Sequence, residues 1–181
     1  MGGRDKAFIL LGGQTLLLHV LGRFAPQVEQ IAISANGDAV RFGRGNVVLA
    51  DTASQGPLSG ILAALDWAAP LGATAVVSVA VDTPFLPTDL VPQLCLAAER
   101  PGGGVAIAAS GGVDHPTFGL WPVGLRSDLR AFLASGAKTR VMDFARNHGA
   151  MRAEFGDEAA FVNLNTPQDL AAAAAMLGDG R

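Results

Sequence analysis

The sequence predicts an α/β fold in three layers, with helices on both faces of a mostly parallel sheet. Two observations lead to this prediction. Short apolar segments rich in β-branched residues alternate along the chain with longer segments of helical periodicity. The short segments are apolar almost throughout, which is typical of strands that are buried on both faces of a parallel sheet. The length of 181 residues suits one substantial core, so we expect residues 1–181 to form a single domain.

The predicted strands follow from apolar runs that are bounded by polar residues or glycine. The clearest runs are residues 30–34, 46–50, 74–81 and 104–110. The segment 115–122, "HPTFGLWP", is also expected to form a strand, although the second half of the chain is less regular. One more strand is expected at the start of the segment "FVNLNTPQDLAAAAAML", which begins at Phe161.

The predicted helices lie between and after these strands. They cover residues 15–24, 58–68, 88–98, 124–135 and 139–149. A last helix has a well-defined start, because Thr166 is a natural N-cap residue and Pro167 fits the first helical position. Asp169 then lies in the first turn, where a negative charge is favourable.

The composition excludes several classes of protein. The chain is 50% hydrophobic and 16% charged, which is typical of a globular protein and not of a disordered one. Its net charge of −3 argues against broad electrostatic binding to nucleic acid or to an anionic membrane. Cys95 is the one cysteine, so no internal disulfide forms, and no apolar run approaches the ~20 residues that span a bilayer. We therefore expect a cytoplasmic protein without nucleic-acid or membrane partners.

Polar residues follow the predicted strands, at the edge where a parallel sheet binds its ligands. Asp82 follows the strand 74–81, and Pro84 disfavours a helical conformation at Thr83, so the carboxylate stays at the rim of the sheet. A carboxylate in this position can bind a hard divalent cation, which in turn holds phosphates. The alternative is a turn aspartate that caps the helix starting near Pro87.

The segment "DTASQGPLSG" follows the strand 46–50 and contains a second group of candidates. Asp51 begins the segment, and Gly56 and Gly60 permit close backbone approach by a flat or charged ligand. Pro57 suits the first turn of a helix, whose free N–H groups can bind an anion. The alternative is an ordinary loop between a strand and a helix.

Three further residues complete the candidate set. The amide of Asn36 can read the edge of a nucleobase or ribose, or Asn36 can simply form a turn. Arg4 and Lys6, in a glycine-rich setting, can neutralise phosphates, or they can be solvated residues near a terminus. The histidines lack zinc-site spacing, and no serine stands in a nucleophile-elbow context. Carboxylates, an amide, glycines and a lysine therefore favour metal-assisted nucleotide chemistry over covalent catalysis.

Seven motifs, in order, carry a family resemblance. They are "GGRDK" at residues 2–6, "ISAN" at 33–36, "DTASQGPLSGILAAL" at 51–65, "VDTPFLP" at 81–87, "HPTFGLW" at 115–121, "RVMDFARNHGA" at 140–150 and "FVNLNTPQDL" at 161–170. Each motif alone is weak, but their shared order is specific. Through them the chain resembles the molybdenum cofactor guanylyltransferases, the MobA family, over nearly its whole length.

The resemblance implies a three-layer nucleotidyltransferase fold and an enzymatic activity. The expected reaction transfers GMP from GTP to molybdopterin carrying molybdenum, releases pyrophosphate and forms the guanine dinucleotide cofactor. Mg²⁺ is the expected cofactor. GTP and molybdenum-molybdopterin are the expected substrates, and molybdopterin-handling proteins and molybdoenzyme chaperones are the expected protein partners.

The resemblance also implies roles for individual residues. Lys6 matches a lysine that contacts the triphosphate, and Asp82 matches the aspartate that holds Mg²⁺ and the nucleotide, so these two residues are the expected catalytic pair. Asn163 and Asn165 match paired asparagines on the molybdopterin side of the cleft. The positions expected to bind the guanosine part are Asn36 and Asp51, and the motif at 51–65 adds Gly56, Pro57 and Gly60 to the substrate-binding set.

The chain departs from the family pattern at two places. Val81 stands where the family usually has a cysteine or a similar small residue before the metal-binding aspartate. At the beginning, the expected first strand and first half of the nucleotide-binding loop are replaced by "GGRDK" alone, so a segment of ~15–20 residues is expected to be missing. The alternatives are a molybdopterin cytidylyltransferase, a sugar-nucleotide transferase of the same fold, and a non-catalytic protein that binds a nucleotide or a pterin.

Overall fold

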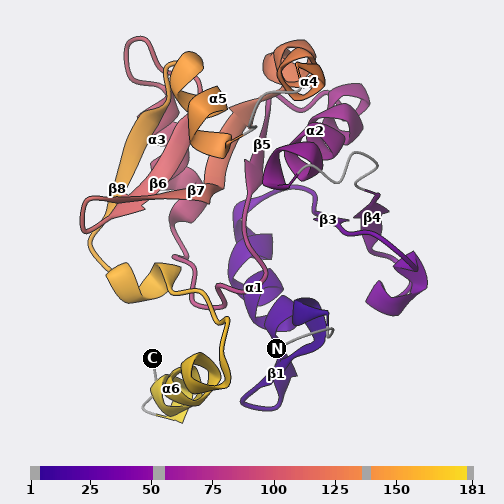
Figure 1. Cartoon of the computed structure of the whole chain (residues 1–181), viewed down its shortest axis with the longest axis vertical. Helices are drawn as coiled ribbons and strands as arrows, with labels where there is room; N and C mark the ends of the chain where they lie inside the picture. The colour runs from indigo at the N-terminus through magenta and orange to yellow at the C-terminus, as the bar shows by residue number, and fades with distance from the viewer. Residues whose placement is uncertain (1–4, 51–55, 136–139, 179–181) are drawn as a thin grey trace.

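A four-stranded sheet forms the centre of the computed structural model, which describes residues 5–50, 56–135 and 140–178 (Figure 1). The strands are β5 (Ala75–Ser78), β6 (Ala106–Ser110), β7 (Val113–Pro122) and β8 (Met151–Phe155). Their spatial order is β5-β7-β6-β8. β6 and β8 pair in parallel, and β7 lies antiparallel between β5 and β6, so β5, β6 and β8 all run in the same direction. The prediction of an α/β fold with a mostly parallel sheet is confirmed.

A second, smaller sheet lies to one side of β5. In it, β3 (Ala32–Ser34) pairs in parallel with β4 (Val47–Leu49). The sequence predicted these strands in one sheet with β5, but in the described part of the chain β3 and β5 do not pair with each other. The helix α2 (Pro57–Ala68) connects the two sheets, because it follows β4 in the chain and contacts β3, β4 and β5.

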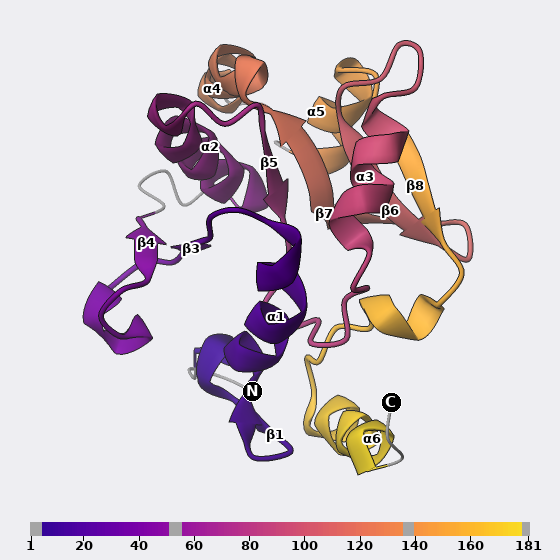
Figure 2. The same cartoon turned by 180° about the vertical axis from the view of Figure 1, so that it is seen from behind.

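Helices cover both faces of the four-stranded sheet (Figure 2). The remaining helices at these faces are α1 (Leu16–Phe24), α3 (Leu90–Ala98), α4 (Arg126–Ala134) and α5 (Val141–Asn147). Residues of α1 and α3 pack in a hydrophobic cluster with Ala106 and Ala108 of β6, whereas residues of α2, α4 and α5 pack with Ile107 of the same strand. Because successive side chains of a strand point to opposite faces, this alternation places the sheet between two helical layers, as expected.

The helix α1 shows how the local sequence sets an element. Thr15 occupies the N-cap position, and its Oγ1 accepts a hydrogen bond of 3.3 Å from the backbone N–H of Leu18. The buried residues Leu16, Val20 and Phe24 recur at intervals of four and form one apolar stripe. The helix predicted at residues 15–24 is therefore present, with its first predicted residue serving as the cap.

Three strand predictions need correction. β5 ends at Ser78 instead of Val81, because the chain leaves the ladder with β7 and turns toward Asp82. No strand forms at the start of the segment that begins at Phe161, since the backbone N–H of Leu164 bonds to the carbonyl of Asp82 and not to a sheet partner. β8 was not predicted, because only Ala153 is buried in it and its polar residues break the apolar pattern.

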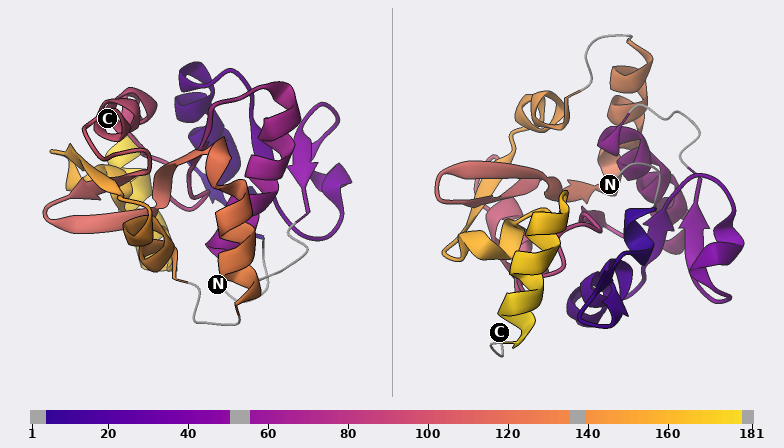
Figure 3. Two further views of the ribbon diagram at one scale, coloured as in Figure 1. Left: turned by 90° about the horizontal axis from the view of Figure 1, so that it is seen from above. Right: turned by 60° about the horizontal axis from the view of Figure 1, so that its bottom comes forward.

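The N-terminal hairpin and the last helix pack together at one end of the molecule. The elements are β1 (Leu10–Leu11), β2 (Gln14–Thr15) and α6 (Pro167–Gly178). Leu11, Leu16, Leu164 and Ala173 form a small buried cluster between them, and Figure 3 shows α6 near the N-terminal elements. This cluster brings the two ends of the described chain to the same side of the molecule.

Short 3₁₀ helices complete the structure. They are η1 (Lys6–Phe8), η2 (Ala25–Gln27), η3 (Ala39–Phe42), η4 (Ala69–Leu71), η5 (Val123–Leu125) and η6 (Glu158–Phe161). Across the three described ranges, every helix is too short or too polar to cross a bilayer.

Candidate active site

Asp82 lies in a tight turn beyond the end of β5. The backbone N–H of Thr83 bonds to the carbonyl of Ala80 at 3.4 Å, and this turn leaves Asp82 at the rim of the sheet, as predicted. Its carboxylate is 16% exposed and lies 2.8 Å from the ammonium group of Lys6. The helix α3 begins only at Leu90, with Asp89 in the N-cap position, so the carboxylate of Asp82 faces Lys6 and not the start of a helix.

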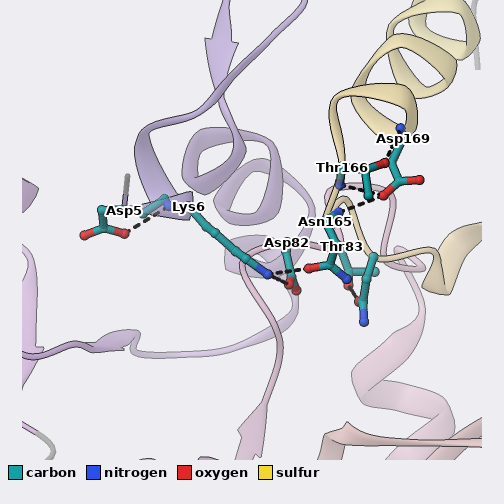
Figure 4. Close-up of polar contacts among 9 residues, drawn as sticks. Asp5, Lys6, Asp82, Thr83, Asn165, Thr166 and Asp169 are labelled. Carbon is teal, nitrogen blue, oxygen red and sulfur yellow. Dashed lines mark hydrogen bonds and ion pairs between the residues drawn. The ribbon is translucent and has the colours of Figure 1, made fainter. Parts of the chain in front are cut away.

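Lys6 comes from the N-terminal end of the described chain and reaches two oxygen atoms (Figure 4). Its Nζ atom donates to Oδ2 of Asp82 at 2.8 Å and to Oδ1 of Asn165 at 2.5 Å. Asp5 caps the 3₁₀ helix η1, because its Oδ1 accepts a hydrogen bond of 3.1 Å from the backbone N–H of Ala7. The cap fixes the start of η1 and thereby holds the base of the Lys6 side chain.

The segment 163–165 lies directly against the Asp82 turn. The backbone N–H of Leu164 donates to the carbonyl of Asp82 at 2.8 Å, and the Leu164 side chain is buried. Thr83, which is itself fully buried, donates from Oγ1 to Oδ1 of Asn163 at 2.6 Å. The structure thus brings Asn163 and Asn165 to Asp82 and Lys6, from positions that are about 80 and 160 residues away in the chain.

A reciprocal cap holds the chain that follows Asn165. The carboxylate of Asp169 accepts hydrogen bonds from the backbone N–H groups of Asn165 and Thr166, and Oγ1 of Thr166 accepts one from the backbone N–H of Asp169. The hydrogen bonds from Thr166 and Asn165 hold the pKa of Asp169 below its usual value. The cap predicted from the sequence therefore also fixes the backbone of a candidate site residue.

Asn36 is connected to the Lys6 segment through Arg41. Arg41 donates from Nη2 to the carbonyl of Asn36 at 2.6 Å and from Nε to Oδ2 of Asp5 at 3.0 Å. Its guanidinium group also lies 4.5 Å from the centroid of the Phe42 ring. Since Asp5 caps η1, Arg41 links the loop after β3 to the loop that carries Lys6.

Gly56 and Gly60 of the 51–65 motif have different structural roles. Gly56 is the N-cap of α2 with a positive φ of 82°, and Pro57 is the first residue of that helix, as predicted. Gly60 faces β3, because a Cβ atom at this position would lie 2.7 Å from Oγ of Ser34. Gly60 therefore allows α2 to pack closely on β3. Asp51 lies outside the described residues.

Asp5 and Arg41 are site residues that the sequence reasoning missed. The signal for Asp5 is present in the sequence, since an aspartate ahead of a short helical turn is a typical N-cap. Arg41 gives no comparable signal, because its two partners belong to separate segments that meet only in the folded chain.

The donor atoms at this site suit a hard cation. In the described ranges, no cluster of three or more histidine, cysteine or acidic side chains could hold a metal by itself. The carboxylate of Asp82 and Oδ1 of Asn165 are nonetheless both hard oxygen donors, and both already face a positive charge on Lys6. Mg²⁺ commonly uses one or two such protein ligands together with phosphate oxygens and water. The arrangement therefore fits a cation that is shared with a bound phosphate.

Residues 1–151 match the MobA-like NTP transferase domain, which places the chain among the nucleotidyltransferases. Sequence relatives narrow this class further. The chain belongs to the molybdenum cofactor guanylyltransferase family, as the resemblance predicted.

Two curated relatives and one solved structure illustrate the match. The molybdenum cofactor guanylyltransferase of Cereibacter sphaeroides (strain ATCC 17029 / ATH 2.4.9) is 57% identical over 98% of this chain and 90% of its own length. The enzyme of that name from Mesorhizobium japonicum is 48% identical over 98% of this chain and 89% of its own length. The crystal structure of molybdopterin-guanine dinucleotide biosynthesis protein A from Archaeoglobus fulgidus aligns with a TM-score of 0.75 at 20% identity, over 98% of this chain and 92% of that chain, which shows the shared fold.

Proposed function

We propose that this chain transfers GMP from GTP to molybdopterin carrying molybdenum, with residues 1–181 acting as one nucleotidyltransferase domain. The observation that carries the proposal is the cluster of Lys6, Asp82 and Asn165 at the end of β5. In an open α/β sheet, ligands bind beyond the carboxyl ends of the strands, and this cluster stands in that position. The identity of the substrates is inferred from the molybdenum cofactor guanylyltransferase that is 57% identical to this chain.

The proposed reaction is an in-line displacement at phosphorus. An oxygen atom of the terminal phosphate of molybdopterin forms a bond to the α-phosphorus of GTP, and the bond from that phosphorus to the bridging oxygen of pyrophosphate breaks. The attacking phosphate is already anionic, so no base has to remove a proton from it. Pyrophosphate leaves with the electron pair of the broken bond, and the dinucleotide remains.

In this proposal Lys6 and Asp82 stabilise the charges of the reacting phosphates. Lys6 places its ammonium group against the triphosphate, where it offsets the negative charge that develops on pyrophosphate. Asp82, with Oδ1 of Asn165 nearby, would hold Mg²⁺. The bound cation supplies charge neutralisation at the phosphate oxygens. In this structure the ammonium group of Lys6 contacts the oxygen atoms of both Asp82 and Asn165, so it would move from them to the triphosphate when the cation binds.

The remaining candidate residues are assigned by their positions around this cluster. Asn36, and Asp51 with it, would bind the guanosine part, and Arg41 holds the backbone of Asn36 beside the Lys6 segment. Asn163 and Asn165 would face molybdopterin. Gly56 and Pro57 offer the N-terminal backbone of α2 to the substrate, whereas Gly60 serves mainly to pack that helix on β3.

The setting of the reaction is part of the proposal. Its substrates are a nucleoside triphosphate and a metal-bearing pterin, so we place the enzyme in the cytoplasm. Proteins that handle molybdopterin, and chaperones of the molybdoenzymes that receive the product, are the proposed partners.

Activity measurements with paired variants test this proposal. The purified chain is incubated with molybdenum-molybdopterin, MgCl₂ and either GTP or CTP, and the dinucleotide product is separated and quantified. We expect product with GTP and a loss of about 100-fold or more in Asp82→Asn, which removes the charge but keeps the side-chain shape. Asp89→Asn is the matched control, because Asp89 lies at the exposed start of α3 and should retain full activity.

Three outcomes would contradict the proposal. Product with CTP but not with GTP would identify a cytidylyltransferase. Nucleotide or pterin binding without any product would identify a non-catalytic binding protein. Equal activity of the parent and Asp82→Asn would show that Asp82 has no role in the reaction.

A further inference from the structure

A buried hydroxyl group lies next to Asp82 in the chain. Thr83 is fully buried, and its Oγ1 donates a hydrogen bond of 2.6 Å to Oδ1 of Asn163. Figure 4 shows Asp82, Thr83 and Asn165 next to one another. Thr83 therefore connects the turn that carries Asp82 to a side chain of the segment 163–165, and the proposed reaction assigns it no role of its own.

This hydrogen bond fixes which end of the Asn163 carboxamide faces Thr83. A buried hydroxyl that does not donate its hydrogen costs free energy, because no water replaces the missing partner. In the described part of the chain, the acceptor for Oγ1 of Thr83 is Oδ1 of Asn163. Turning the carboxamide over would place Nδ2 against Thr83, and Nδ2 only donates hydrogen bonds. The carboxamide is therefore held with Oδ1 toward Thr83 and Nδ2 away from it.

The backbone of Asn163 is held by buried side chains on either side of it. Phe161 packs in the hydrophobic cluster of the large sheet, and Leu164 packs in the small cluster near α6. The backbone N–H of Leu164 also bonds to the carbonyl of Asp82 at 2.8 Å. Because the main chain is fixed on both sides, the rotation of its side chain is the main freedom left to Asn163, and the hydrogen bond from Thr83 removes it.

The two asparagines of this segment present different groups. Oδ1 of Asn165 faces the ammonium group of Lys6, so this oxygen stands where a positive charge is bound. Oδ1 of Asn163 is occupied by Thr83, and among the described residues its Nδ2 group has no hydrogen-bond partner. Since Asn163 is also exposed, it offers a hydrogen-bond donor to a ligand, and the partner of such a donor is an acceptor oxygen.

We propose that Thr83 is a positioning residue, whose buried hydroxyl holds the Nδ2 group of Asn163 outward as a hydrogen-bond donor to a phosphate oxygen of molybdopterin. This inference rests on the proposed function, which places Asn163 on the molybdopterin side. The segment of Asn163 is bonded to the Asp82 turn, so the donor stands close to the point where the two phosphates react. A donor that is already oriented binds the phosphate without first losing its freedom to rotate.

Nuclear magnetic resonance of the free protein tests the orientation of Asn163 without the reaction. In the ¹⁵N-labelled chain, the side-chain amide signal of Asn163 is assigned from its disappearance in Asn163→Asp, and ¹⁵N relaxation measures its mobility. We expect a rigid amide in the parent and in Thr83→Ser, which keeps the hydroxyl. We expect a mobile amide in Thr83→Val, which replaces the hydroxyl by a methyl group. Thr88→Val is the matched control and should leave the amide rigid, because Thr88 is exposed in the same connection between β5 and α3.

Binding measurements test what the oriented donor does. Isothermal titration calorimetry compares molybdopterin, dephosphorylated molybdopterin and GTP with MgCl₂ as ligands of the purified chain. Thr83→Val should bind molybdopterin about tenfold more weakly than the parent, whereas Thr83→Ser should bind it as the parent does. Dephosphorylated molybdopterin and GTP should bind equally to all three proteins. Asn163→Asp should also weaken molybdopterin binding, because the carboxylate removes the donor and repels the phosphate.

The orientation of Asn163 has clear contrary outcomes. A mobile Asn163 amide in the parent would overturn the inference by itself, so the test does not depend on the folding of a variant. Thermal unfolding checks that Thr83→Val folds, and an amide that stays rigid in the folded variant would equally overturn the inference. So would Thr83→Ser if it weakened molybdopterin binding as much as Thr83→Val.

The ligand assignment has contrary outcomes of its own. Weaker GTP binding in Thr83→Val would assign Asn163 to the nucleotide, and an equal weakening with dephosphorylated molybdopterin would assign it to the pterin. Either result would overturn the proposed contact with the phosphate. A parent that binds molybdopterin more tightly than Thr83→Val but transfers no GMP would contradict the proposed function alone and would still support the role of Thr83.

Discussion

Lys6 stands between oxygen atoms from two distant parts of the chain. Its ammonium group lies 2.8 Å from Asp82 and 2.5 Å from Asn165, and its side chain is still 40% exposed. An exposed ion pair of this kind contributes little to stability, with typical values of about 0–1 kcal/mol. We therefore expect the positive charge of Lys6 to serve the reaction and not the stability of the fold.

Replacing Lys6 by methionine should affect the reaction far more than the fold. Lys6→Met keeps an unbranched side chain but removes the charge, so kcat/KM for GTP should fall by about 100-fold, while the melting temperature should change little. Steady-state kinetics and thermal unfolding measure the two effects. Arg44→Met is the control, because Arg44 is an exposed cation in the connection between β3 and β4. Equal losses in the two variants would indicate a general effect of net charge.

At the scale of elements, the contact between α2 and β3 depends on a missing side chain. Gly60 lies so close to β3 that a Cβ atom would stand 2.7 Å from Oγ of Ser34 and 3.4 Å from its Cβ. The first distance is far inside van der Waals contact, whereas the second is close to ordinary contact. Since α2 also contacts β5, this close packing holds the small sheet beside the large one.

A double-mutant cycle at this contact should show strong coupling. Gly60→Ala should lower the free energy of unfolding by about 1–3 kcal/mol, because the added methyl group collides with the Ser34 hydroxyl. Ser34→Ala removes that hydroxyl, so the double variant should recover most of the loss. Urea denaturation of the four proteins measures the cycle. Strictly additive effects would show that the Gly60 methyl group meets no obstacle at Ser34.

For the molecule as a whole, His115 lies where β7 meets the segment that leads to Asn163. Its ring stacks on Phe161 with a centroid separation of 4.3 Å, and Nε2 lies 2.8 Å from Oγ of Ser110. Phe161 in turn contacts Phe118 and Phe155 in the larger hydrophobic cluster. Burial lowers the pKa of His115, and the neighbouring carboxylate of Asp114 only partly opposes this effect.

The lowered pKa predicts a loss of stability in mild acid. The unfolded chain protonates His115 at a pH of ~6.5, whereas the folded chain resists protonation until a lower pH. In this window the unfolded state binds more protons, so the free energy of unfolding falls as the pH falls. His115→Gln should show a shallower fall when urea denaturation is repeated from about pH 7.5 to pH 5. An unchanged pH profile in the variant would exclude His115 as the source.

The elements were predictable where a local signal dominates. Each of three correctly predicted features depends on residues that are close together in the sequence. They are the apolar stripe of α1, the N-cap at Thr166 and the apolar run of β6. β8 escaped prediction because the exposed residues Arg152 and Glu154 interrupt its apolar run. The segment around Leu164 has the alternation of a strand, but its backbone is bound to the Asp82 turn instead of to a sheet.

The sequence by itself determined the fold class, the family and the chemical types of the candidate residues, because periodicity, caps and motifs are local properties that the chain keeps in any conformation. Only the tertiary structure decided that Lys6 faces Asp82 and Asn165, and that Arg41 joins Asn36 to Asp5. These contacts join residues far apart in the chain. Their geometry follows from how the helices and sheets pack, and no local pattern encodes that packing.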